Sequence, residues 1–523
     1  MVKFKKLSRI FSSSVFLIAF FSIISRLFGL LRDRLLASTF GAGDALDSYY
    51  AAFRLPDLIF NTLIFGALGS AFIPQFVKLW HEDKEQAVKL ANNLLNILFI
   101  IILILTIIFW FLTPNLTPLF TPGFSLAKQL LTIDLTKIML LSIIFFSLST
   151  MMSSILNSLH KYLFYSLAPL FYNLGIISGI LFIGKNSGVT GAAWGVVIGS
   201  GLHFLIQLID VFKTGWRYQL VFEFNGLMKK IFKLMVPRAF GLLVNQINQI
   251  IITFLCSLLK SGSLSIFNFA INIQYLPINI FGISLSTVAF PFFSQYWARN
   301  DHLNFFNKLL ESFRRILFLS IPISLFLIFF SKEIVNLLLG AGRFDILAVE
   351  ETSQALIFFS LSIFAQSLLP IITKAFYAQE DTKTPVKISI ISIILNIILA
   401  IILMKFLAIS GLVISYSLSA IFNFFILYLI IRKRINAQTP FNLKYYYLKI
   451  FFIALPAILL SFITMIIMNE LFLNNTFIIL LIKLLFSLSL FIFSFYKLSV
   501  YFKIKEIELI KNFLFLKNGL SKN

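Results

Sequence analysis

Long apolar runs separated by short polar breaks follow one another along the whole chain. A membrane-spanning helix needs about 20 apolar residues, and we count fourteen such runs in the 523 residues. They lie near 11–38, 48–78, 88–113, 127–157, 162–184, 189–212, 231–259, 264–296, 311–331, 351–377, 386–405, 408–431, 447–469 and 475–501. The runs are too long and unbroken for the alternating strands of a membrane barrel. The pattern predicts an all-α integral membrane protein with about 14 transmembrane helices.

The pattern also repeats itself at an offset of about 220 residues. The first copy reads FGLLRD, GAGD, a proline at Pro56 and AFIPQF, and the second reads FGLLVN, SGSL, a proline at Pro277 and AFPFFSQ. Six predicted spans separate the copies, so both enter the membrane with the same polarity. Parallel repeats of this kind are typical of transporters that hold substrate between two halves. Pro56 and Pro277 are candidate hinges or kinks, because proline removes a backbone donor from a helix.

The repeat predicts three parts in the chain. Residues 1–213 form an N-terminal six-helix bundle with a cationic cavity, and residues 214–435 form a C-terminal six-helix bundle. Residues 436–523 hold two additional transmembrane helices and a basic tail.

The composition indicates a membrane protein, and the positions of its charged residues indicate how the chain is oriented in the membrane. The chain is 59% hydrophobic and 12% charged, with a formal net charge of +23. Its lysines and arginines gather in both tails and in the connections after the sixth and twelfth spans, which predicts that both termini are cytoplasmic. The charges flank spans throughout the chain instead of sharing one face, so we expect membrane lipids and no nucleic acid as partners. No small-residue cleavage site follows the basic start, so we expect a retained first span.

Enzyme chemistry has little support in the sequence. Cys256 is the single cysteine, and the four histidines lack the short spacing of a helical zinc site. DDxxD, P-loop and HExxH motifs are also missing from the sequence. We therefore expect no metal, no cofactor and no catalytic activity.

Arginines inside the first two apolar runs are the candidate chemistry. Arg26, Arg32 and Asp33 lie in the first run, and Arg54 lies in the second. A charge near the bilayer centre costs roughly 2.5–3.5 kcal/mol, so such residues usually face a water-filled pathway. Guanidinium forks bind two oxygens at once, which suits phosphate or pyrophosphate. We expect the three arginines to bind an anionic head group, with Asp33 and Asp47 orienting or neutralising them.

Simpler interpretations of the same residues stay open. Arg32 and Arg34 are also compatible with a helix end at the interface, from which long side chains reach water. Asp47 precedes a predicted helix and is also a candidate capping residue.

Several motifs resemble one known family. The segments SRLFGLLRDRLLASTFGAGDALDSYYAAFRLPDLI (25–59), GALGSAFIPQF (66–76), SILNSLHKYLFYSLAPLFYN (154–173) and FYAQEDTKTPVKI (376–388) are similar to the MurJ/MviN family of lipid II flippases. The resemblance extends to about residue 435. It implies a fourteen-helix transporter of the bacterial cytoplasmic membrane, acting as a monomer on lipid II, an undecaprenyl-pyrophosphate-linked peptidoglycan precursor. It also implies that Arg26, Arg32, Arg54, Asp33 and Asp47 bind substrate.

The sequence departs from the family pattern in its second half. Ile271 and Asn272 stand where many members have an acidic–basic pair, and Phe65 stands where members often have glutamate. Gln246 and Asn272 are the second-half residues expected to line the cavity. The alternative function is export of another lipid-linked oligosaccharide, or of drugs, by the same architecture. A drug-cation exporter is expected to use acidic cavity residues, whereas this chain offers arginines.

Overall fold

The computed structural model of the chain describes residues 2–62, 66–434, 443–472 and 476–507. Every regular element in these ranges is a helix, which confirms the all-α prediction. Within these ranges, nine helices are long and apolar enough to cross a membrane, or ten if the bent pair Ile346–Ser360 and Ile363–Ala378 is one span. Each of the fourteen predicted spans falls on one helix or on a group of consecutive helices.

The chain packs as two compact units. One consists of Met1–Ser265 with Leu338–Ala348, and the other of Ile266–Leu337 with Val349–Asn523. The predicted division at residues 213 and 435 stays a prediction. The helix Gly226–Ser257, which follows residue 213, packs within the first unit.

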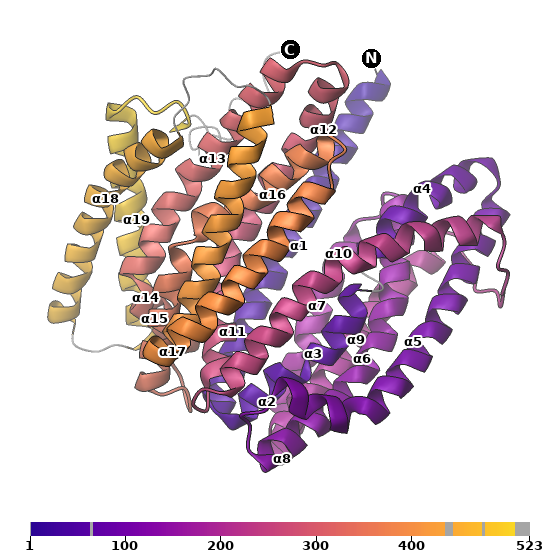
Figure 1. The fold of residues 1–523 in the computed structure, drawn as a ribbon, viewed down its shortest axis with the longest axis horizontal. Coiled ribbons are helices and arrows are strands. Elements are labelled where there is room, and N and C mark those ends of the chain that lie inside the picture. Colours follow the sequence, from indigo (N-terminus) through magenta and orange to yellow (C-terminus); the bar gives the residue numbers. More distant parts are fainter. Residues whose placement is uncertain (1, 63–65, 435–442, 473–475, 508–523) are drawn as a thin grey trace. The chain divides into compact units, whose positions relative to one another are not determined.

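The first unit holds the N-terminal helices (Figure 1). They are α1 (Val2–Phe40), α2 (Asp44–Ala52), α3 (Arg54–Phe60), α4 (Gly66–Glu82), α5 (Lys84–Phe120), α6 (Leu126–Ser158), α7 (Leu163–Ser178), the π-helix η2 (Gly179–Ile183), α8 (Gly184–Ser187), α9 (Val189–Phe212) and α10 (Gly226–Ser257). Side chains at three of the helix starts accept backbone N–H bonds, as expected of N-caps. Asp83 caps α5, Ser125 caps α6 and Asn225 caps α10.

Glycines allow two helices of this unit to approach closely. Gly175 of α7 and Gly179 of η2 face Gly191, Gly195 and Gly199 of α9. A Cβ added at Gly195 would lie 2.8 Å from the Ile176 Cα atom, closer than real Cβ contacts. Small residues on facing helices are a common packing device in membranes, where hydrophobic burial does not drive helix association. The contact holds α7 and α9 together on one side of the candidate site.

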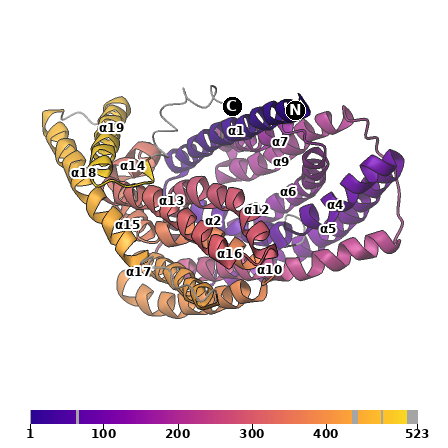
Figure 2. The ribbon, with the colours of Figure 1, turned by 90° about the horizontal axis from the view of Figure 1, so that it is seen from above.

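The second unit contains most residues of the remaining helices, of which α18 and α19 lie side by side (Figure 2). They are α11 (Ser263–Pro277), the π-helix η3 (Ile278–Ile283), α12 (Ser284–Ala298), α13 (His302–Phe329), α14 (Ser331–Leu339), α15 (Ile346–Ser360), α16 (Ile363–Ala378), α17 (Lys383–Arg434), α18 (Leu443–Leu471) and α19 (Phe477–Tyr501). α17 is two helices joined at Ala408, whose φ of 47° is not helical. The predicted boundary between the spans at 386–405 and 408–431 falls at this break.

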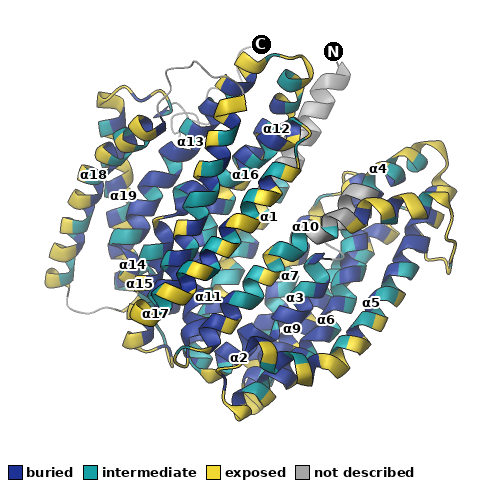
Figure 3. Cartoon of the chain, viewed as in Figure 1, coloured by how far each residue is buried: buried dark blue, intermediate teal, exposed yellow. Residues whose placement is uncertain are grey.

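Apolar residues occupy both the inside and the outside of this unit. Phe313, Phe318 and Phe330 are fully buried in a core that also takes residues from α16, α18 and α19. Figure 3 colours part of α18 as exposed, and the exposed residues of this helix include Phe452 and Ile463. Exposed apolar side chains along a long apolar helix are expected where the solvent is lipid.

Candidate functional site

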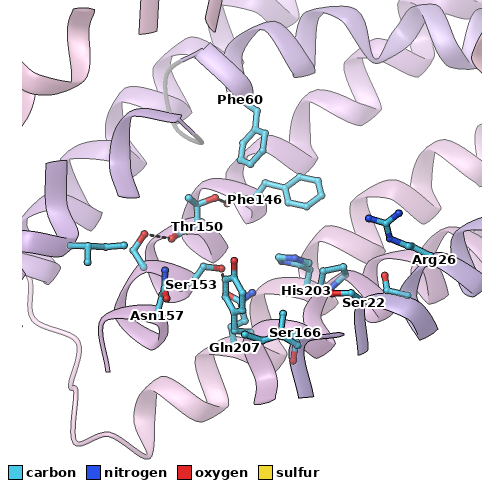
Figure 4. A pocket seen from close by; sticks show the side chains of 16 residues that line it. Ser22, Arg26, Phe60, Phe146, Thr150, Ser153, Asn157, Ser166, His203 and Gln207 are labelled. Atoms are coloured by element: carbon cyan, nitrogen blue, oxygen red, sulfur yellow. Dashed lines mark hydrogen bonds between the residues drawn. The ribbon is translucent and has the colours of Figure 1, made fainter. Parts of the chain in front are cut away.

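A cavity of about 650 Å³ lies among α1, α3, α4, α6, α7 and α9 of the first unit. Arg26 and Ser22 of α1 line it (Figure 4), and so does Ser25 of the same helix. Ser22 and Arg26 are four residues apart, so they share one face of α1. None of the sixteen lining residues is acidic, and all of them belong to the described part of the chain.

The Arg26 guanidinium lines this cavity and has no bonding partner among the described residues. Among the described residues it makes no hydrogen bond and no ion pair, although it is half-buried. A buried or half-buried cation normally pairs with an anion or lies in water. This position can therefore accept an anionic ligand without first breaking an ion pair within the protein.

Arg32 lies near Arg26 in sequence but has protein partners. Its Nε and Nη2 atoms donate to Asp33 Oδ1 over 3.0 and 2.8 Å, and its Nη1 donates to Asn173 Oδ1 over 3.2 Å. Asn173 in turn donates to the Ser25 carbonyl oxygen over 3.2 Å, which ties α7 to α1. Asp33 thus orients an arginine, as the sequence predicts. The Arg32 side chain keeps 23% of its surface exposed.

Arg54, at the start of α3, is buried at 7% exposure. Its Nε donates over 2.6 Å to the Thr253 hydroxyl of α10, and this hydroxyl donates to the Gln249 carbonyl oxygen. Pro56 lies in the first turn of the same helix, where proline is tolerated because its missing N–H is not needed. The arginine therefore joins α3 to α10. The lining of the 650 Å³ cavity includes Arg26 but neither Arg32 nor Arg54.

Asp47 differs from the expectation that it orients an arginine. It is 1% exposed, and its Oδ1 accepts from the Ser265 N–H and hydroxyl over 2.8 and 2.6 Å. Its Oδ2 accepts from the Gly262 N–H and from Lys128 Nζ, each over 2.8 Å. These donors account for both carboxylate oxygens, so Lys128 takes the place that the prediction gave to an arginine.

Asp44 extends this network toward the surface. Its carboxylate lies 2.7 Å from Lys128 Nζ, and its side chain is 62% exposed. The hydrogen bonds from Lys128 and Ser261 lower the pKa of Asp44. Lys128 is itself buried, so one lysine is shared between a buried and an exposed carboxylate.

Gln246 and Asn272 are the cavity residues predicted for the second half of the sequence. Gln246 is half-buried on α10, and Asn272 is half-buried on α11 beside Ile271, which is 5% exposed. Pro277 ends α11 where the π-helix η3 begins, and π-helical turns often accompany functional distortions. Phe65 lies outside the described residues, as does the predicted basic tail beyond residue 507.

Polar residues that the sequence analysis missed line the cavity opposite Arg26. Ser153 and Asn157 come from α6, and His203 and Gln207 come from α9. Each pair is spaced four residues apart, so each projects from one face of its helix. This spacing inside apolar spans was the available signal, and it is weak because serine and histidine also occur singly in membrane helices.

Fold comparison gives the class of protein first. A solved inward-facing MATE-family multidrug-resistance transporter of the MOP superfamily is similar to this chain with a TM-score of 0.68 and 15% sequence identity. The match covers 79% of this chain and 94% of that one. The likeness at this identity concerns the fold alone, and it indicates a multi-pass, all-α membrane fold.

Sequence comparison gives the family. The family model "Lipid II flippase MurJ" matches residues 36–502, so the chain belongs to this family. A probable lipid II flippase MurJ of Buchnera aphidicola subsp. Schizaphis graminum is 32% identical over 422 residues, covering 79% of this chain and 82% of that protein. The lipid II flippase MurJ of Burkholderia cenocepacia is 29% identical over 426 residues, with the same two coverages.

A solved structure supports the same family. Lipid II flippase MurJ in an inward closed conformation is similar with a TM-score of 0.76 and 27% identity, covering 95% of this chain and 100% of that one. The resemblance seen in the sequence motifs is confirmed. Family membership and the apolar helices together indicate a multi-pass protein of the bacterial inner membrane.

Proposed function

We propose that this chain is a flippase that carries lipid II from the cytoplasmic to the outer leaflet by alternating access. Family membership supports the substrate class, since relatives along most of the chain are named lipid II flippases. One structural observation carries the proposal. The half-buried Arg26 guanidinium lines a cavity of about 650 Å³ and has no partner among the described residues.

The chemistry of Arg26 suits the pyrophosphate of the substrate. A guanidinium donates two parallel N–H bonds to a pair of phosphate oxygens, and such charge-assisted bonds are roughly twice as strong as neutral ones. Ser22, one turn away and also lining the cavity, offers a hydroxyl donor to the same anion. The substrate-binding role predicted for Arg32, Arg54, Asp33 and Asp47 stays a prediction, since each of them bonds to a protein group and none of them lines this cavity.

The test is complementation of bacteria depleted of their own flippase. Arg26→Ala is expected to abolish growth while protein abundance stays near normal. Arg26→Lys is expected to give partial growth, because the charge stays but the two-pronged geometry is lost. Arg299→Ala is the matched control, because Arg299 is exposed at the end of α12 and lies outside the cavity. Full growth with Arg26→Ala would refute the role of this cavity in binding the anion.

Orientation, oligomeric state and mode of action complete the proposal. The distribution of lysine and arginine supports cytoplasmic termini, and fusion reporters placed after Lys213 and Arg434 test this topology. We expect a monomer, which native mass spectrometry of the purified protein can check. We also expect that it transports its substrate without chemical change, which mass analysis of the transported lipid can check. Transport of another lipid-linked oligosaccharide is the alternative, and competition with purified lipid II in a vesicle assay distinguishes the two.

A further inference from the structure

The wall of the cavity opposite Arg26 is built from uncharged polar side chains. Figure 4 shows Arg26 well separated from Ser153, Asn157 and Gln207, which lie close to one another. The two helices that supply this wall, α6 and α9, pack directly against each other. The cavity therefore has a cationic part and a separate neutral polar part.

Gln207 is held in place through one end of its amide only. Its Oε1 accepts from the Ser153 hydroxyl over 2.8 Å and from the Ser149 hydroxyl over 3.3 Å. Its amide nitrogen has no partner among the described residues, although the residue is only 1% exposed. Exchanging the amide oxygen and nitrogen does not remove this feature, because serine hydroxyls both donate and accept. One end of a buried amide is left for something that enters the cavity, since buried polar groups are normally hydrogen-bonded.

His203 adds a second fixed polar group. One ring nitrogen, Nδ1, lies 2.6 Å from the Ser149 hydroxyl, so the same serine positions both His203 and Gln207. The other ring nitrogen has no partner among the residues that the structure describes. Asn157, one turn beyond Ser153, has no side-chain hydrogen bond within the described chain and also lines the cavity. Three amide or imidazole groups thus present unpaired donors or acceptors.

Aromatic rings complete the lining. The Phe60 and Phe146 ring centroids are 5.3 Å apart, and the Phe146 ring lies 5.6 Å from the His203 ring. Both phenylalanines line the cavity. Few convergent polar groups on an aromatic and apolar background are typical of small-molecule pockets, whose volumes run from about 300 to 1,000 Å³. A sugar ring combines a hydroxyl-rich edge with an apolar face, so this lining matches a saccharide.

We propose that this polar wall is a saccharide subsite, which binds the hydroxyl and acetamido groups of the sugar linked to the pyrophosphate. The inference rests on the proposed function, because it takes the pyrophosphate at Arg26 as the neighbouring group. The absence of acidic residues from the described cavity lining argues against a cationic ligand. The wall would then distinguish a sugar-bearing lipid from the bare lipid carrier, which Arg26 alone cannot do.

Binding to two pure lipids tests the proposal. The probes are a peptide-free disaccharide linked to undecaprenyl pyrophosphate, and undecaprenyl pyrophosphate itself, measured by native mass spectrometry on the purified full chain. Asn157→Ala and Gln207→Met are expected to weaken binding of the disaccharide lipid about tenfold and to leave the bare pyrophosphate lipid unchanged. Arg26→Ala is expected to weaken both lipids.

Matched variants separate binding from folding. Gln207→Met keeps the side-chain volume, and Gln129→Met alters a glutamine of α6 whose amide donates to the Thr121 carbonyl oxygen away from the cavity. Asn157→Ala removes no hydrogen bond within the described chain, so it decides the question even if Gln207→Met fails to fold.

Each outcome has a distinct meaning. Equal loss of both lipids in the wall variants, or loss of neither, would overturn the saccharide subsite. If Arg26→Ala changes neither lipid while the wall variants discriminate between them, the anion site of the proposed function fails and the saccharide subsite stands.

Discussion

The buried carboxylate of Asp47 gives the sharpest stability prediction. Asp47→Asn keeps the size of the side chain but replaces one acceptor oxygen with an NH₂ group. The amide oxygen can still accept from Ser265, whereas the NH₂ group faces the Gly262 N–H and Lys128 Nζ, both donors. The substitution therefore removes a buried ion pair and leaves a buried backbone donor without an acceptor.

The magnitude follows from these lost contacts. Removing one partner of a buried ion pair costs about 3–5 kcal/mol. We take the lower end, about 3 kcal/mol, because Asp44 still pairs with Lys128 over 2.7 Å. The Tm shift per kcal/mol falls with size, because the unfolding entropy is about 2.1 cal/mol/K per residue. For a chain of this size we therefore expect a drop of about 3–5 °C.

Thermal unfolding of the purified protein measures this drop, and Asp44→Asn is the matched control. Asp44 binds the same lysine from a side chain that is 62% exposed, and exposed ion pairs contribute about 0–1 kcal/mol. The two substitutions delete the same charge at the same partner and differ in burial. Equal Tm shifts in both variants would refute the reasoning that burial makes Asp47 a structural anchor.

Two further predictions concern helix packing and a turn. Gly195→Ala is expected to lower Tm by several degrees, because its Cβ would lie 2.8 Å from the Ile176 Cα atom; Gly201→Ala in the same helix meets nothing within 4 Å and should leave Tm unchanged. At Asp381, burial raises the pKa, but hydrogen bonds from Thr384 and Arg434 outweigh it and lower the pKa to about 2. The ion pair therefore stabilises the fold above pH ~4, by at most ~1 kcal/mol because it is partly exposed, and this contribution disappears as the pH falls through about 2. Asp381→Asn should accordingly lower Tm slightly at pH 7 and by less at pH 3; an undiminished difference at pH 3 would contradict the assignment.

The helices could be predicted from the sequence because one physical requirement dominates them. A span must be apolar for about 20 residues whatever its neighbours are, so even the break near Ala408 lies where the apolar runs part. The expectation that Arg26 and Arg32 act at one site does not follow from their sequence positions alone. Six residues place them roughly 120° apart on a helix, and in the structure Arg26 lines the cavity while Arg32 binds Asn173.

The partners of the charged residues could not be predicted from the sequence. Thr253 is 199 residues from Arg54, and Lys128 is 81 residues from Asp47, so neither pair leaves a local pattern. The prediction paired Asp47 with the arginines of the expected anion site, whereas the structure pairs it with Lys128. Contacts between helices depend on packing, and packing depends on side-chain shape along whole helix faces. Gln207 was not predicted as a site residue for the same reason, because the sequence does not show that it lines a cavity.

The charged residues of the first unit fall into two kinds, those that bond to protein groups and those that do not. Asp47 and Arg54 are 1% and 7% exposed, and both bind groups of the protein, so their charges stabilise the fold. Arg26 is half-buried without a partner in the described chain, so the free energy of its desolvation is not offset within the fold. An anion that enters the cavity offsets that cost, and its own desolvation is offset in turn by Arg26. The same argument applies to the neutral amide of Gln207, so the two groups that the fold leaves unsatisfied mark the two ends of the ligand that we propose.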